Sequence, residues 1–65
     1  MKGNLLMNCL WYEDISPDQL ADVLELPSEK LYDKIFGHEE FTTEEIKKIV
    51  ALLGLTKEET NMIFG

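Results

Sequence analysis

The 65-residue sequence contains no arginine at all. Its only strong cations are six lysines, set against 13 aspartate and glutamate residues, so the net charge is −7. Arginine is the side chain that most often reads guanine, and its fork-shaped head pairs well with phosphate. A basic surface is also the usual electrostatic mark of a DNA-binding domain. The composition therefore weighs against nucleic acid as a partner, without excluding it.

Cysteine is almost absent too, and long apolar runs are missing. Cys9 is the single cysteine, so no disulfide can form within the chain. A lone cysteine on an apolar helix face is most often a small buried hydrophobic residue. No run approaches the roughly 18 apolar residues that a membrane span needs, and residues 1–12 lack the pattern of a secretory signal. We expect a cytoplasmic protein that does not enter a membrane.

The residue patterns of catalytic and metal sites are also lacking. The one histidine, His38, adjoins Glu39 and Glu40, whereas ligands of a helical metal site stand at i, i+4 spacing. There is no nucleophile–base pair and no glycine-rich phosphate loop. A chain this short is too small to enclose a substrate pocket of useful size. We expect no enzymatic activity, no metal and no cofactor.

Helical periodicity is what the sequence does have. Apolar residues recur at helical spacing along the whole chain, and no stretch shows the alternation typical of a strand. Five helices are predicted, over about residues 3–13, from Ser16 to about 24, from Pro27 or Ser28 to Gly37, from Thr42 to Gly54, and from Thr56 to the end. The sequence therefore predicts an all-α fold, formed by one domain over residues 1–65.

Local signals place the helix ends. Three helices begin with a capping box, in which Ser or Thr is followed three residues later by Glu or Gln. The pairs are Ser16–Gln19, Thr42–Glu45 and Thr56–Glu59. Gly37 and Gly54 are placed to end their helices in the left-handed conformation. The apolar stripe of the second helix is expected to comprise Leu20, Val23 and Leu24, and Phe41 is expected to fill the core from a loop.

Two consecutive stretches carry a family resemblance. The sequence ISPDQLADVLELPSEKLYDKIFG, followed by FTTEEIKKIVALLGLTKEE, resembles the lambda-repressor-like (Cro/CI, XRE-type) helix-turn-helix family of small phage and mobile-element regulators in Gram-positive bacteria. The resemblance covers roughly residues 5–64 and rests on Ala21, Leu26, Leu31, Ile35 and Gly37. It implies a five-helix domain with the helix-turn-helix motif at about residues 16–37.

The resemblance also implies a function. Members of this family meet duplex DNA with the first turns of the motif's two helices. The positions concerned are held here by Pro17, Ser28, Glu29, Lys30, Asp33 and Lys34. This implies a DNA-binding transcriptional regulator, expected to form a homodimer through Met62, Ile63 and Phe64. The family usually has a glycine where Glu25 stands, so Glu25 either adopts positive φ or shifts the turn.

Charge and aromatic residues favour a different partner. Residues 16–38 hold five acidic side chains and two lysines, a net charge of −3. Tyr32 and Phe36 stand one turn apart beside the expected core positions, and Trp11 and Tyr12 end the first helix; Trp11 either completes the core or lies exposed. Clustered exposed aromatics usually indicate binding. The alternative hypothesis is an acidic fold that binds a basic protein surface, as an antirepressor or DNA mimic; the DNA-binding regulator remains the leading hypothesis.

Overall fold

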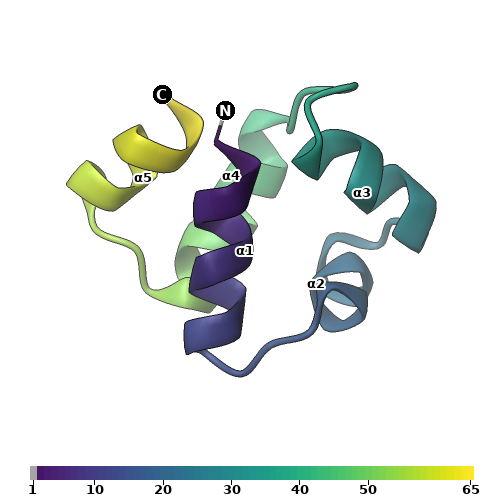
Figure 1. Ribbon diagram of the computed structural model, residues 1–65, viewed down its shortest axis with the longest axis horizontal. Helices are drawn as coiled ribbons and strands as arrows, with labels where there is room; N and C mark the ends of the chain where they lie inside the picture. Colours follow the sequence, from purple (N-terminus) through teal and green to yellow (C-terminus); the bar gives the residue numbers. More distant parts are fainter. Residues whose placement is uncertain (1) are drawn as a thin grey trace.

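The computed structural model describes residues 2–65, which form five α-helices and no strand. The helices are α1 (Gly3–Tyr12), α2 (Pro17–Leu24), α3 (Ser28–Ile35), α4 (Thr43–Leu53) and α5 (Lys57–Phe64). In Figure 1, α1 lies in front of α4, with α5 on one side and α2 and α3 on the other. The predicted all-α fold of five helices is confirmed. No helix in the described part of the chain has the length and apolar character needed to cross a membrane.

The three predicted capping boxes are present. In α2, the Ser16 backbone N–H donates to Gln19 Oε1 at 2.7 Å, and the Gln19 N–H donates to Ser16 Oγ at 3.1 Å. The same reciprocal bonds begin α4 and α5. Pro27 is the N-cap of α3, which settles where that helix begins. Local sequence therefore fixes these helix starts, because each box involves residues only three apart.

A small apolar core joins all five helices. The buried hydrophobic residues are Leu6, Leu10, Leu20, Ala21, Leu24, Leu31, Ile35, Phe41, Ile49, Leu53 and Ile63. Phe41 is buried as predicted. The prediction for Val23 is wrong, since its side chain is 41% exposed. Leu20, Ala21 and Leu24 define the buried sector of α2, and at 100° per residue Val23 falls outside that sector.

In the turn between α2 and α3, Glu25 adopts positive φ, which is one of the two alternatives expected from the sequence. Glu25 adopts the left-handed conformation, with φ 58° and ψ 40°. Only glycine adopts it without cost, and another residue there loses about 1–2 kcal/mol. Glu25 therefore forms this turn in the left-handed conformation that favours glycine, and Ser28 at the start of α3 is exposed.

Helix α5 packs on the chain's own core. Ile63 is 3% exposed, and the Phe64 ring meets the Phe41 ring edge-on with 5.8 Å between centroids. The Lys2 backbone N–H donates to the Ile63 carbonyl at 2.8 Å, which ties the chain's start to α5. Of the three residues predicted to pair with a second copy, only Met62 is exposed. Ile63 is therefore not accessible to a second copy in this fold, Phe64 is half-buried, and pairing through Met62, Ile63 and Phe64 stays a prediction.

Candidate interaction surface on helix α3

The first turn of α3 faces solvent. Ser28, Glu29 and Lys30 are exposed, and the Asp33 side chain retains 51% of its accessible surface. Pro17, at the start of α2, is half-buried. We call the surface formed by Ser28, Glu29, Lys30 and Asp33 the outer face of α3. These residues share one helix and successive turns, so a single partner can contact all of them.

Lys34 does not belong to this face, which corrects its prediction as a contact residue. It is 7% exposed, and its Nζ lies 2.6 Å from Glu45 Oε1. The ammonium also lies 5.9 Å from the centre of the Phe41 ring. The side chain is turned inward because a carboxylate and an aromatic face are both available there to a desolvated cation. The ion pair between Lys34 and Glu45 thus connects α3 to the first turn of α4.

Glu45 has a second role besides its capping box. Its Oε1 accepts both from Lys34 and, at 2.9 Å, from the Thr42 backbone N–H. Burial raises the pKa of this carboxyl, but the hydrogen bonds from Lys34 and Thr42 outweigh burial, so the pKa is lowered from its ordinary value. The folded protein therefore favours the charged form of Glu45.

This lowered pKa predicts a loss of stability in acid. The Glu45 contribution is fully present above the ordinary pKa of 4.5 and is lost as the pH falls through the lower pKa of the folded state. Urea unfolding between pH 7 and pH 3 should show stability falling below about pH 4.5. Glu45→Gln, which keeps the capping geometry, should flatten that part of the profile. An unaltered profile in this variant would assign the acid dependence to other carboxylates.

Lys30 is the exposed cation of the outer face, and it is paired. Its Nζ lies 2.6 Å from Glu39 Oε1, with both side chains substantially exposed. The hydrogen bond with Glu39 raises the pKa of Lys30, and the same bond lowers the pKa of Glu39. His38 Nδ1 lies 3.7 Å from Asp33 Oδ1. The acidic loop after α3 therefore folds back along the helix and adds Glu39 beside the outer face.

Ser28 is held by a contact that sequence reasoning missed. Its Oγ donates to Asp18 Oδ1 at 2.9 Å, joining the first turns of α2 and α3. Both residues have ordinary local explanations, Ser28 as a helix-start residue and Asp18 as a first-turn acid. The nine residues between them carry no signal of the pairing, because only the packing of the two helices creates it.

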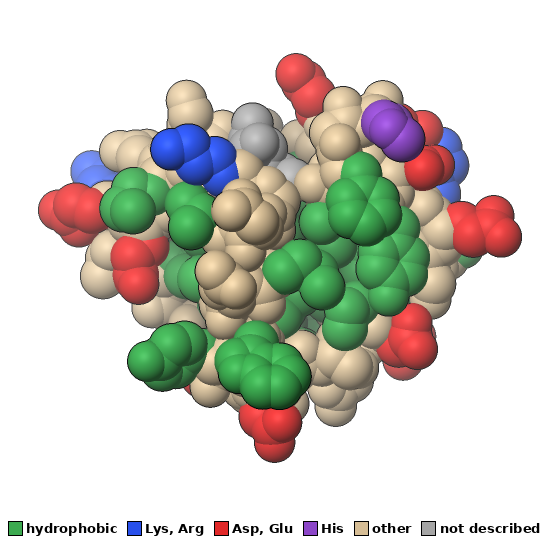
Figure 2. All heavy atoms as spheres, viewed as in Figure 1, with side chains coloured by type: hydrophobic (Ala, Val, Ile, Leu, Met, Phe, Trp, Pro, Cys, Tyr) green, Lys and Arg blue, Asp and Glu red, His purple; other side chains and the backbone are tan. Residues whose placement is uncertain are grey.

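The two aromatic residues of α3 form a pair beside the acidic residues. The Tyr32 and Phe36 rings are stacked, with centroids 6.0 Å apart and planes 18° from parallel. Phe36 is 68% exposed and Tyr32 37% exposed. Trp11 and Tyr12 are 84% and 90% exposed, so Trp11 does not complete the core. Figure 2 shows hydrophobic side chains gathered over α3 and over one end of α1, with acidic side chains around the outline.

Other chemistry is sparse on the described surface. No group of three or more His, Cys, Asp or Glu side chains in residues 2–65 is arranged to hold a metal ion. Comparisons of the chain with protein-family models, with curated proteins and with solved structures find no match. The outer face of α3 and the Tyr32–Phe36 pair are therefore interpreted from their own chemistry.

Proposed function

We propose that this chain is a helix-turn-helix domain of the lambda-repressor-like type that binds a basic surface of another protein through the outer face of α3. The observation that carries the proposal is the distribution of charge around α3. Glu29 and Asp33 face solvent, whereas Lys34 is withdrawn into a buried pair with Glu45. Such a domain would act as an antirepressor or as a DNA-mimicking inhibitor of a nucleic-acid-binding protein.

Electrostatics supports a basic partner over phosphate. Lys30 and Lys34 are the only cations in α2 and α3. Lys34 can reach a phosphate only by leaving Glu45, which strands a partly buried carboxylate. Salt screens charges beyond about 8 Å but leaves the close repulsion by Glu29 and Asp33. A lysine- or arginine-rich surface meets the same carboxylates with attraction.

The Tyr32–Phe36 pair adds large side chains that can anchor a partner, which the acidic residues alone do not provide. Interface energy is concentrated in a few large side chains, with aromatics prominent among them. Tyr32 and Phe36 present stacked rings next to the acidic face, and cations pack well on such rings. Acidic residues that orient the partner and aromatic residues that anchor it together favour a protein-binding surface.

A DNA-binding transcriptional regulator is the second candidate, and the turn geometry favours it. Glu25 keeps the left-handed turn, and Ser28, Glu29 and Lys30 remain exposed at the start of α3, where the resembling family contacts duplex DNA. A carboxylate such as Glu29 can also accept from cytosine N4. This candidate rests on an analogy from fold to function.

A DNA titration separates the two candidates. The purified protein is mixed with duplex DNA, first at about 50 mM salt and then at about 200 mM. Protein binding through an acidic face predicts no retardation of random or operator-like duplexes at the lower salt concentration. Retardation that is lost steeply at the higher salt concentration would support the DNA-binding regulator and remove the first candidate. The reason is that the fall of DNA affinity with salt concentration reports how many counterions the protein displaces from the phosphates.

Phe36→Ala tests the anchor directly. With the tagged domain as bait in a bacterial lysate, we expect capture of basic proteins, and a loss of roughly thirtyfold in affinity for them when this ring is removed. Thermal stability should hardly change, because Phe36 is 68% exposed. Leu52→Ala is the control: Leu52 is 37% exposed near the end of α4 and is not part of the outer face of α3, so its truncation should leave capture intact. Undiminished capture by Phe36→Ala contradicts the anchor role.

A further inference from the structure

A second surface lies between α1 and α5. An open groove of about 420 Å³ runs along α1 and is lined by Leu5, Asn8, Cys9 and Tyr12 of this helix and by Glu13, which caps its C-terminal end. These positions follow i, i+3, i+4, i+7 and i+8, so they form one face of the helix. Over eight helical steps of 1.5 Å the lined length is about 12 Å. The groove is therefore elongated, with a volume in the range of ligand-binding clefts.

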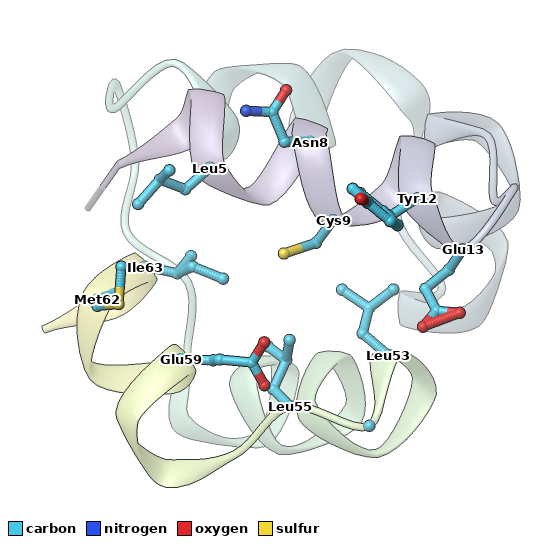
Figure 3. Close-up of a pocket in the computed structure, with 11 residues that line it drawn as sticks. Leu5, Asn8, Cys9, Tyr12, Glu13, Leu53, Leu55, Glu59, Met62 and Ile63 are labelled. Atoms are coloured by element: carbon cyan, nitrogen blue, oxygen red, sulfur yellow. The ribbon is translucent and has the colours of Figure 1, made fainter.

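The groove has an apolar floor and an acidic edge. Leu53, Leu55 and Ile63 supply the apolar side facing α1. Figure 3 shows the Cys9 thiol pointing into the space between α1 and α5, with the Glu59 carboxylate on the opposite wall. Two of the lining residues carry negative charge and none is a lysine. An occupant of this site must therefore be apolar along its length and cationic at its edges.

Both edge carboxylates are available to a ligand. Neither Glu13 nor Glu59 forms an ion pair among the described residues. Glu59 Oε1 accepts from the Thr56 backbone N–H at 2.9 Å, which leaves its second oxygen free. Burial raises the pKa of the Cys9 thiol, and the negative charges of Glu59 and Glu13 raise it further. The negative potential of both carboxylates thus extends into the groove.

We propose that this groove binds an amphipathic helix of another protein, which carries apolar anchors at i, i+4 and i+7 and lysine or arginine beside them. Anchors at i and i+7 are about 10 Å apart along a helix, which fits the 12 Å of lined length. A second copy of this chain is a poor occupant, because it brings a charge of −7 to an acidic groove. The proposal is independent of the function assigned to α3.

The test uses a synthetic probe and amide NMR. The probe is an acetylated, amidated 15-residue leucine–lysine peptide with leucines at i, i+3, i+4 and i+7 spacing, and its control is the same composition in an order without a helical face. Titration into ¹⁵N-labelled protein should shift amides of α1, α5 and the segment joining α4 to α5. The control peptide should bind more weakly. No shifts at about 1 mM probe would overturn the proposal.

Matched variants separate groove binding from general charge attraction. Glu13→Gln with Glu59→Gln removes both edge charges, and glutamine keeps the capping box of α5 as Gln19 does in α2. We expect roughly five- to tenfold weaker binding of the probe. Glu44→Gln with Glu58→Gln removes two first-turn charges outside the groove and should leave binding unchanged. Equal weakening in both variants overturns the proposal.

Two further readouts locate the probe. Bound probe should protect Cys9 from alkylation by N-ethylmaleimide at pH 8.5, because the thiol lies inside the groove; unprotected alkylation at saturating probe counts against it. Shifts confined to α3 would overturn the groove while leaving the proposed function of α3 intact. Groove shifts that depend on protein concentration without probe would identify a second copy as the occupant and equally overturn the proposal.

Discussion

Lys34→Met is expected to lower the free energy of unfolding by about 3 kcal/mol, because it leaves the carboxylate of Glu45 partly buried without its cation. The Glu45 side chain retains only 13% of its accessible surface, and that of Lys34 only 9%. Removing one member of such a pair costs far more than removing an exposed one. Methionine keeps much of the unbranched stem that packs near Phe41, so loss of packing is a smaller part of the effect.

The size of this effect matters for so small a chain. At 0.05–0.15 kcal/mol per residue, a domain of this length has a total stability of about 3–10 kcal/mol. A loss of about 3 kcal/mol shifts the melting temperature by well over 10 °C, at 4–8 °C per kcal/mol for domains of this size. Thermal unfolding followed by circular dichroism measures the shift directly.

A double-mutant cycle isolates the pair. Lys34→Met combined with Glu45→Gln should recover stability to within about 1 kcal/mol of the parent, because an apolar side chain then faces a neutral amide. The matched control is Lys30→Met. It removes an equally short but exposed ion pair with Glu39, so the melting temperature should hardly move. Equal losses for the Lys30 and Lys34 variants would show that burial does not set the strength of these pairs.

Reversing two charges on the outer face of α3 should have the largest effect on binding. Glu29→Lys with Asp33→Lys is expected to weaken capture of a basic protein partner roughly a hundredfold, since like charges brought together across an interface cost several kcal/mol. The net charge changes from −7 to −3. Circular dichroism should show a folded helical domain, because Glu29 and Asp33 are on the surface.

The same variant discriminates between the two candidate functions by the direction of its effect. If α3 meets DNA, two added lysines strengthen binding to duplex DNA and steepen its dependence on salt. If α3 meets a basic protein, the same two lysines weaken binding roughly a hundredfold. Glu44→Lys with Glu58→Lys gives the same net charge on α4 and α5 and should leave capture unchanged. Unchanged capture by the α3 variant, at any salt concentration, would remove the acidic-face mechanism.

Local sequence predicted the helices because their signals are local. The capping boxes, the glycine stops and the apolar spacing all act between residues three or four apart. The same helical geometry placed Tyr32 and Phe36 on one rim of α3, and the structure shows their rings stacked. The burial of Phe41, a loop residue, was also predicted from the sequence.

The candidate site was less predictable because its charges are sorted by distant partners. Lys30 and Lys34 stand one turn apart on α3, and nothing local distinguishes them. Glu39 keeps the first at the surface, and Glu45 draws the second into the interior. Lys34 could therefore be named as a contact residue from sequence, although the packing of α4 removes it from the surface.

The sequence by itself determined that this protein is helical, acidic and free of arginine, and its three capping boxes determined where α2, α4 and α5 start. These properties depend on composition and on neighbours within one turn. Only the tertiary structure decided that Lys30 stays exposed while Lys34 is buried, and that Ile63 packs on the chain's own core. The groove between α1 and α5 is likewise formed only by the packing of the helices. The buried lysine and the packing of Ile63 arise where residues far apart in sequence are desolvated together. The free energy of that desolvation depends on contacts between helices, so no single helix contains it.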